Sequence, residues 1–282
     1  MPKAQAHELR CAGRVVARYV WDPRLPATVS PRPYLHPVTT LGGTTVTGFM
    51  PDDHVHHLGA SIALPIVNNV NFWGGSTYVT GHGSIRLDNH GRQDHHRWLH
   101  RDDGRAEHEL HWTGRDGVTL VRERRALTVR QLTHDAWMLR VIFTLTSADG
   151  TTLEIDSPAA RGREGAGYGG FFWRAPAGLD RVHAYGRDTD GDVHGNRDPW
   201  VVLSGHRDGG APWTLIFLAD EKDPWFVRSA DYAGVCSAIA WKRLTIAPGG
   251  TLTRRLSVVI ADGPPSSAIT DTATAAIREE PA

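Results

Sequence analysis

The chain has 282 residues, 40% of them hydrophobic, with 10 Trp, 30 Gly, 17 Pro and a formal net charge of zero. A balanced charge argues against a nucleic-acid-binding protein and against a polybasic membrane anchor, and no window is apolar enough for a transmembrane helix. Two cysteines, Cys11 and Cys236, are too few for a disulfide scaffold, and the sequence leaves their pairing open. Without an apolar signal segment at the N-terminus, we expect a cytoplasmic protein.

The first half of the chain predicts short strands separated by turns. Residues 14–20 read as the first strand, and five prolines between residues 21 and 37 exclude a helix there. Residues 60–67 are apolar and short, as expected of a buried strand. Residues 82–116 are rich in charge and histidine, which indicates an exposed hairpin or a long loop with strand ends.

The strand signal becomes regular from residue 117 onward. Apolar residues alternate through 137–145 with the period of two that marks one buried face. Further strands are expected at 118–130, 152–155, 200–203, 213–218, 238–246 and 252–260. Only residues 266–280 favour a helix, with Ser267 as its N-cap. We therefore predict an all-β fold, a large antiparallel β-sandwich forming a single domain over 1–282, with its core at 14–263 and a helical tail at 264–282.

A histidine-rich stretch, Asp53-His54-Val55-His56-His57, is the strongest candidate for chemistry. Imidazole changes its protonation near neutral pH, which suits acid/base catalysis, and it is a common metal ligand. In a strand, His54 and His56 would share a face, with His57 on the opposite face. The sequence contains none of the usual zinc motifs, so a divalent metal held by His54 and His56 would need further ligands from elsewhere. An exposed polar turn is the alternative.

A second group combines glycines with aromatic residues. Residues 165–170 allow sharp backbone bends, and Tyr168, Trp173 and Arg174 stand in or directly after them. Sugar rings have apolar C–H faces that stack on aromatic rings and hydroxyl rims that need polar partners, so this inventory fits a carbohydrate pocket. A run of core aromatic residues after a glycine turn is the alternative for each ring.

Carboxylates and an arginine gather at two loop-to-strand junctions, residues 196–200 and 220–228. Paired carboxylates would suit glycosidic cleavage, although acidic turns before proline are ordinary loop chemistry, which is the interpretation we favour. Glu123 is an isolated carboxylate that remains a catalytic candidate, and Arg228 remains a candidate for substrate binding. No GxSxG motif supports a serine triad.

Several motifs, taken in order, resemble the bacterial PmoA-like family of unknown function, over residues 14–263. They are Arg32-Pro33-Tyr34-Leu35-His36-Pro37-Val38, Asp53-His54-Val55-His56-His57-Leu58-Gly59, Asn71-Phe72-Trp73, Tyr168-Gly169-Gly170-Phe171-Phe172-Trp173-Arg174 and Trp225-Phe226-Val227-Arg228. The methane oxygenase label attached to that family does not transfer, because this chain has no membrane-spanning segment. The resemblance implies a galactose-mutarotase-like sandwich and a setting among sugar-catabolism genes, beside oxidoreductases that make keto-sugars.

These observations together predict a carbohydrate-active enzyme that cleaves a glycosidic bond by hydrolysis or elimination. The resemblance adds a keto-glycoside, made by a partner sugar oxidoreductase, as one candidate substrate. A sugar epimerase or mutarotase and a non-catalytic carbohydrate- or metal-binding module are the alternatives. The catalytic candidates are His54, His56, His57, His82 and Glu123. The substrate-binding candidates are His36, Asn71, Trp73, Tyr168, Trp173, Arg174 and Arg228. A divalent metal is the one cofactor left open, and an exposed sheet edge would suit a homodimer.

Overall fold

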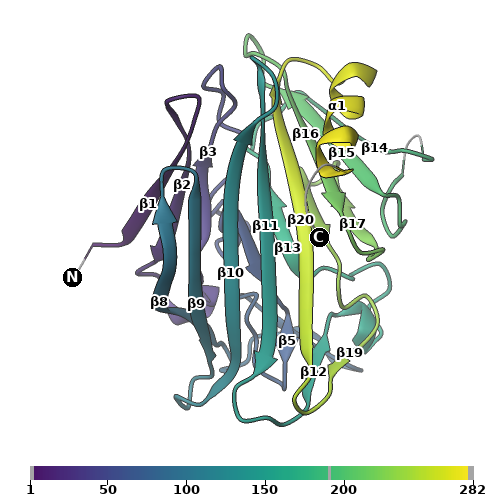
Figure 1. Ribbon diagram of the computed structural model, residues 1–282. Helices are drawn as coiled ribbons and strands as arrows, with labels where there is room; N and C mark the ends of the chain where they lie inside the picture. The colour runs from purple at the N-terminus through teal and green to yellow at the C-terminus, as the bar shows by residue number, and fades with distance from the viewer. Residues whose placement is uncertain (1–2, 190–191, 279–282) are drawn as a thin grey trace.

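Two large antiparallel sheets form the body of the protein (Figure 1). The computed structural model describes residues 3–189 and 192–278. One sheet has seven strands, in the order β1 (Gln5–Cys11), β2 (Arg14–Asp22), β3 (Tyr34–Val38), β4 (Ala60–Ala63), β13 (Gly170–Arg174), β18 (Gly234–Ser237) and β17 (Trp225–Arg228). This sheet takes strands from both halves of the chain, so residues far apart in sequence share its two faces.

The second sheet has eight strands and faces the first. Its order is β14 (Arg181–Gly186), β15 (Trp200–His206), β16 (Trp213–Ala219), β20 (Thr251–Asp262), β11 (Ala136–Ser147), β10 (Thr119–Gln131), β9 (Arg105–Thr113) and β8 (Arg92–Asp102). Two small sheets complete the fold, one of β19 (Leu244–Ile246), β12 (Leu153–Asp156) and β5 (Ile66–Val67), the other of β6 (Thr77–Val79) and β7 (Gly83–Ile85). The predicted all-β antiparallel sandwich is confirmed.

The period-two pattern of β11 explains how the layers pack. Trp137, Val141 and Phe143 are fully buried between the two large sheets. Met138, on the opposite face of the same strand, packs under α1 (Ser267–Arg278), which covers the outside of the eight-stranded sheet (Figure 1). Burying apolar side chains on both faces gives the sheet a main core and a smaller one beneath the helix.

The C-terminal helix confirms the predicted tail and corrects its cap. Ser266 Oγ accepts a hydrogen bond from the backbone N–H of Ile269 at 3.3 Å, so the cap lies one residue before the predicted Ser267. The predicted helix extends to Glu280, and its last two residues lie outside the described ranges. No helix in the described part of the chain is long and apolar enough to cross a membrane.

Three strand predictions need correction. Residues 60–67 form two strands in different sheets, β4 and β5, because the chain turns at Leu64-Pro65. Residues 238–246 are mostly turn, with only β19 at their end, and β1 precedes the predicted first strand. Two η segments, Ala27–Val29 and Ala159–Arg161, are single 3₁₀ turns in the linkers. The charged segment is confirmed as a hairpin, β8–β9, at the edge of the large sheet.

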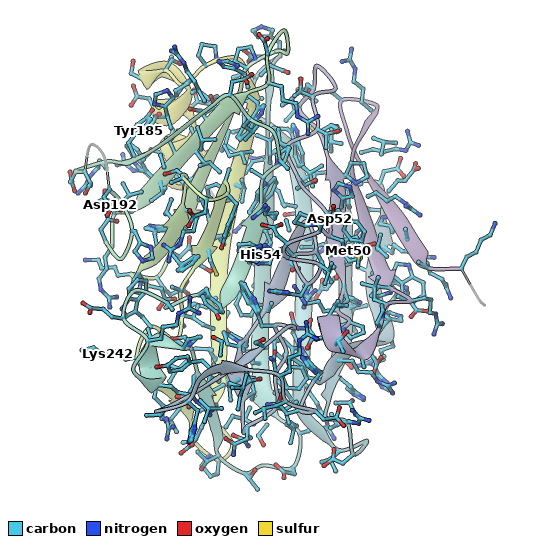
Figure 2. The ribbon with its side chains drawn as sticks, turned by 180° about the vertical axis from the view of Figure 1, so that it is seen from behind. Met50, Asp52, His54, Tyr185, Asp192 and Lys242 are labelled. Atoms are coloured by element: carbon cyan, nitrogen blue, oxygen red, sulfur yellow. The ribbon has the colours of Figure 1, made fainter. Side chains whose placement is uncertain are left out.

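The outer face of the seven-stranded sheet holds the candidate site. A small apolar cluster on this face includes Trp73, Phe172 and Phe226, with Tyr168 and Tyr232 packed against it. Figure 2 shows Met50, Asp52 and His54 near the middle of the molecule, seen from the side opposite to Figure 1. Cys11 and Cys236 are both free and buried, in strands β1 and β18, which four other strands separate.

Candidate functional site

The histidine stretch folds as two consecutive turns, not as a strand. The backbone N–H of His54 donates to Pro51 O at 2.8 Å, and that of His57 donates to His54 O at 2.9 Å. Gly59 then closes the segment with a φ of 53°, in contact with the backbone of β3, where a Cβ would stand 2.2 Å from Leu35 O. The predicted alternation of His54 and His56 against His57 is therefore wrong. The turns bring all three rings together.

Arg32 holds these turns in place from below. Its side chain is fully buried, and it donates to three backbone carbonyls, of Val29, Ser30 and Trp73, at 3.0 to 3.1 Å. A further N–H donates to His56 O at 2.8 Å, and Nε donates to a serine hydroxyl on β4. Burial lowers the pKa of Arg32 to about 9, so the guanidinium still carries its charge at neutral pH. A buried cation satisfied mainly by carbonyls thus fixes the loop that carries the histidines.

The three imidazoles form one compact group. The rings of His54 and His57 stack with centroids 4.6 Å apart, and His56 meets His57 edge-on at 4.8 Å. Phe172 and Tyr232 pack against His57 at 4.9 and 5.3 Å. The group is thus walled by aromatic rings from strands and loops distant in sequence.

Burial sets the protonation of the two inner histidines. Desolvation, with the nearby charge of Arg32, lowers the pKa of His56 to about 3. His57 is 2% exposed, and desolvation holds its pKa well below the usual range. Both rings are therefore neutral at neutral pH.

His54 differs from its neighbours because it has a carboxylate partner. Its Nδ1 lies 2.9 Å from Oδ2 of Asp53, at an angle outside hydrogen-bond geometry, and its side chain is 36% exposed. Contact with His54 is the main cause that lowers the pKa of Asp53, whose carboxylate is ionised at neutral pH. With Nδ1 turned to Asp53, Nε2 is the ring nitrogen available to a ligand.

A cavity of about 520 Å³ opens in front of these rings. Trp73, Tyr168 and Phe226 contribute aromatic surface to its wall, and Trp73 and Tyr168 lie 4.6 Å apart between ring centroids. Its polar lining comes from Asp53, the three histidines, Arg163, Arg228, Asp231 and Tyr232. The volume suits a small organic ligand, with an apolar wall to stack on and donors and acceptors around it.

Arg174 is a second buried cation beside this cavity. Arg174 is 4% exposed; its guanidinium lies 4.2 Å over the ring of Tyr232, and one nitrogen, Nη1, is buried without a hydrogen-bond partner. Burial raises the pKa of Tyr232 to about 12, so its phenol remains protonated. An N–H group left without a partner on a buried cation is unfavourable.

Two predicted substrate-binding residues turn out to support the fold. Trp173 is fully buried in the main core and donates from Nε1 to Val46 O, because alternation along β13 points Phe172 and Arg174 outward and Trp173 inward. Asn71 is 2% exposed, and its Oδ1 accepts hydrogen bonds from the backbone N–H groups of Trp73 and Gly74. It shapes the loop behind Trp73 and does not line the cavity.

Two predicted catalytic residues also lie elsewhere. Glu123 is 1% exposed between the sheets, where its carboxylate binds Arg125 Nε at 2.7 Å and Trp112 Nε1 at 2.7 Å. This is a buried ion pair of the core, remote from the histidine turns. His82 is exposed at the tip of the β6–β7 hairpin and does not line the cavity. His36 lies in a neighbouring cavity, where its Nδ1 is 3.0 Å from Thr47 Oγ1.

A family model described as a family of unknown function (DUF6807) matches residues 6–275. The chain belongs to this family. That description carries no activity and does not include the PmoA name, so the finer family likeness stays a prediction. No curated protein matches the chain.

Two solved structures resemble the chain at low similarity. One is a protein of Escherichia coli K12 with the provisional name aldose 1-epimerase, at 11% identity and a TM-score of 0.43, covering 92% of this chain and 99% of that one. The other is the alpha-galactosidase of Lactobacillus brevis, at 11% identity and a TM-score of 0.44, covering 92% of this chain and 40% of that one. Neither similarity assigns an activity to this member of the family.

Sequence reasoning missed several residues of the site. Asp53 lies inside the histidine motif and is not among the predicted catalytic residues, although a carboxylate next to a histidine often influences its imidazole. Tyr232 and Asp231 lie in an irregular segment without a motif. His194 was not selected either; it accepts from Val227 N at 3.2 Å and contacts Arg228 at 3.2 Å, and so positions the predicted Arg228.

The two predicted metal ligands, His54 and His56, lie within the histidine turns. Their ring centroids are 5.8 Å apart, and the ring planes are tilted by 54°. No group of three or more His, Cys, Asp or Glu side chains within residues 3–189 and 192–278 is arranged to hold a metal ion.

Proposed function

We propose that the protein is a carbohydrate-active enzyme that cleaves a glycosidic bond by elimination from a keto-glycoside. The observation that carries the proposal is the Asp53–His54 pair, set beside two neutral imidazoles at the wall of an aromatic-lined cavity. We infer that a sugar oxidoreductase makes the ketone, by oxidising a ring hydroxyl before the glycoside binds here.

The cavity offers both kinds of surface that a sugar ring needs. Trp73 and Tyr168 present flat aromatic faces, which suit the C–H face of a pyranose. Arg228 and Asp231 contribute a donor and an acceptor to the same lining, which suit ring hydroxyls. Arg228 stacks over Phe226 at 4.2 Å, which limits its motion and directs its N–H groups. The ring would thus be held by one face and by its rim.

His54 is assigned as the general base. The ionised Asp53 carboxylate, 2.9 Å from Nδ1 of His54, stabilises the imidazolium that forms when Nε2 takes a proton. His56 and His57 are both neutral, so a proton on His54 meets no like charge in its immediate ring neighbours. This explains why three adjacent histidines can serve one proton transfer.

The elimination uses a proton made acidic by the ketone. His54 removes the proton from the carbon between the ketone and the anomeric carbon, and the electron pair of that C–H bond forms an enolate. The enolate collapses to a carbon–carbon double bond at the anomeric carbon as the glycosidic C–O bond breaks. The leaving oxygen keeps that bond pair and takes a proton from Tyr232, whose phenol is protonated. The products are an unsaturated keto-sugar and an alcohol.

Two groups complete the balance of the reaction. The Arg174 guanidinium, which lies behind the Tyr232 ring beside the cavity, stabilises the negative charge of the enolate electrostatically. Afterwards the proton on His54 restores the phenol of Tyr232, whose ring centroid lies 5.4 Å from that of His54. The protein ends the cycle unchanged.

The test compares keto-glycosides with their parent glycosides. We expect the keto form alone to release an alcohol and an unsaturated keto-sugar, and NMR in deuterium oxide detects both products. His54→Gln should lower kcat/KM by about 10²- to 10⁴-fold and Asp53→Asn by a smaller factor, with His134→Gln, an exposed histidine on a turn, as the matched control. Release from parent glycosides at equal rates would indicate hydrolysis instead. Anomer interconversion without release, or unchanged turnover in His54→Gln, would overturn the proposal.

A further inference from the structure

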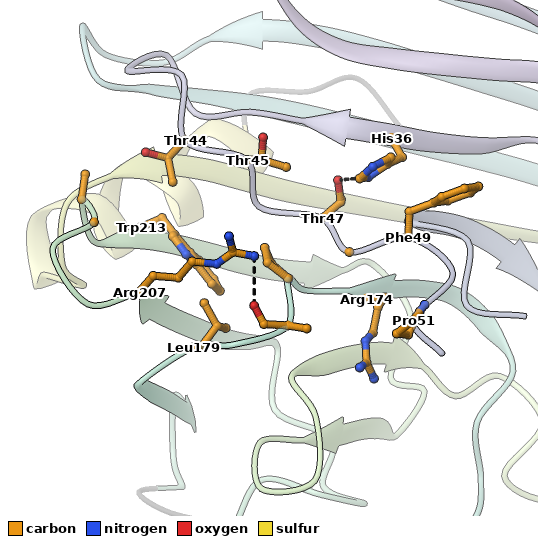
Figure 3. Close-up of a pocket in the computed structure, with 15 residues that line it drawn as sticks. His36, Thr44, Thr45, Thr47, Phe49, Pro51, Arg174, Leu179, Arg207 and Trp213 are labelled. Atoms are coloured by element: carbon orange, nitrogen blue, oxygen red, sulfur yellow. Dashed lines mark hydrogen bonds between the residues drawn. The ribbon is translucent and has the colours of Figure 1, made fainter. Parts of the chain in front are cut away.

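A second and larger cavity lies next to the histidine site. Its volume is about 680 Å³, and residues from β3, the following loop, β13 and the β15–β16 turn line it. Figure 3 shows His36, Thr47 and Phe49 on one side and Arg207, Leu179 and Trp213 on the other. Apart from Arg174, the function proposed above uses none of the residues that line this cavity.

A third hollow of about 380 Å³ lies between the two cavities. It shares Asp53, Asp231 and Tyr232 with the histidine cavity. It shares Arg174 and Ala177 with the larger cavity. The three hollows therefore adjoin one another, from the histidine cavity past Arg174 to the second cavity, and this row of hollows is called the groove below.

The second cavity has the lining of a sugar site. The ring of His36 stacks on Phe49 with centroids 5.1 Å apart and planes at 15°, which makes a flat surface. Burial lowers the pKa of His36, so this surface is uncharged. The hydroxyls of Thr44 and Thr45 and the guanidinium of Arg207 supply polar groups around it. Apolar faces with a few polar groups suit a pyranose ring as they do in the first cavity.

Arg174 stands where the groove passes from one cavity to the other. Its guanidinium lies over Tyr232, a wall of the histidine cavity, and its side chain also lines the second cavity. The unpartnered Nη1 belongs to a side chain only 4% exposed. A ligand spanning both cavities would pass this cation, whose charge attracts the oxygen atoms of a sugar.

We propose that the second cavity is the subsite for a second sugar ring, the one released when the glycosidic bond breaks. The substrate class is then a keto-disaccharide or a longer keto-oligosaccharide, with its oxidised ring at the histidines and the neighbouring ring on the His36–Phe49 surface. This inference rests on the proposed function and names its substrate class.

The experiment fills the second cavity and compares substrates of two lengths. Ala177 is exposed and lines both the second cavity and the connecting hollow, so Ala177→Trp places an indole in the groove. Thr45→Trp does the same from the opposite side. Ala268→Trp, at an exposed position of α1, is the matched control. Unfolding curves establish that each variant is folded.

Two readouts keep this inference separate from the proposed function. The first is the ratio of kcat/KM for a keto-disaccharide to kcat/KM for the keto form of a methyl glycoside. Ala177→Trp and Thr45→Trp should each lower this ratio about tenfold or more, whereas Ala268→Trp should leave it unchanged. The second is calorimetric binding of cellobiose, maltose and lactose relative to the methyl glucosides and galactosides, which needs no turnover. If no keto-glycoside is cleaved but the groove variants weaken disaccharide binding alone, the subsite stands and the proposed reaction fails. If the variants change neither ratio, the subsite is refuted whatever the reaction.

Discussion

Replacing Arg32 by Met tests whether one buried cation organises the histidine turns. The variant removes hydrogen bonds to the carbonyls of Val29, Ser30, Trp73 and His56 and to the Ser61 hydroxyl. Each such bond contributes about 1 kcal/mol net, and an unsatisfied buried carbonyl adds to the loss. The methionine side chain recovers part of this by filling the apolar volume. We therefore expect the free energy of unfolding to fall by about 3–5 kcal/mol.

Urea unfolding followed by tryptophan fluorescence measures this loss. Arg24→Met is the control, because Arg24 is half exposed and makes only a surface ion pair with Asp22, worth at most about 1 kcal/mol. At temperatures where Arg32→Met is still folded, loss of the bond to His56 should also lower kcat/KM for a keto-glycoside, since a shift of about 1 Å in catalytic groups can cost about 10²-fold. If the free energy of unfolding falls by less than about 1 kcal/mol and activity is unchanged, the histidine turns do not depend on Arg32 for their structure.

Three further predictions concern the neighbouring groups. As the pH falls, His57 binds a proton in the unfolded chain but not in the folded one. The free energy of unfolding should therefore fall by about 2 kcal/mol between about pH 7.5 and about pH 5. In urea unfolding, His57→Gln should remove this part of the pH dependence, whereas His134→Gln should not. In thermal melts, Gly75→Ala should lower the Tm of the protein more than Gly81→Ala does. Both glycines have a positive φ, but only a Cβ at residue 75 would contact the His56 ring, at 2.9 Å. Glu123→Gln should cost about 3–5 kcal/mol by leaving Arg125 unpaired, yet folded protein should keep its kcat; a selective loss of kcat would return Glu123 to the catalytic candidates.

The sheets could be predicted where alternation was strong, because antiparallel strands buried on one face repeat every two residues. Residues 118–130, 137–145 and 252–260 became β10, β11 and β20 with small changes at their ends. The prediction failed at 60–67, where an apolar run carries no period and cannot reveal that Pro65 sends its two halves into different sheets. It failed at 238–246 for a similar reason, since buried turn residues are as apolar there as strand residues.

The histidine-rich part of the sequence contains the candidate site, but it also contains histidines that do not belong to the site. His95 and His108 lie in β8 and β9, and their Nδ1 atoms are 2.9 Å apart. His108 also meets the phenol of Tyr19 at 2.7 Å, so this pair belongs to the packing between the sheets. Sequence proximity therefore grouped two unrelated sets of imidazoles, and only three-dimensional pairing separates the set that faces the cavity.

The strand β13 shows most directly why residue type alone could not define the site. Its run Phe171-Phe172-Trp173-Arg174 has the composition of a sugar-binding motif, but the strand presents its side chains alternately to the core and to the outer face. Phe172 and Arg174 lie on the outer face, where they pack against His57 and Tyr232 respectively, whereas Phe171 and Trp173 fill the sandwich. Which pair faces outward depends on the pairing of β13 with β4 and β18, two strands far away in sequence. The same pairing places Arg174 in the lining of both the second cavity and the hollow beside it, so the strand contributes to the proposed substrate groove as well as to the core.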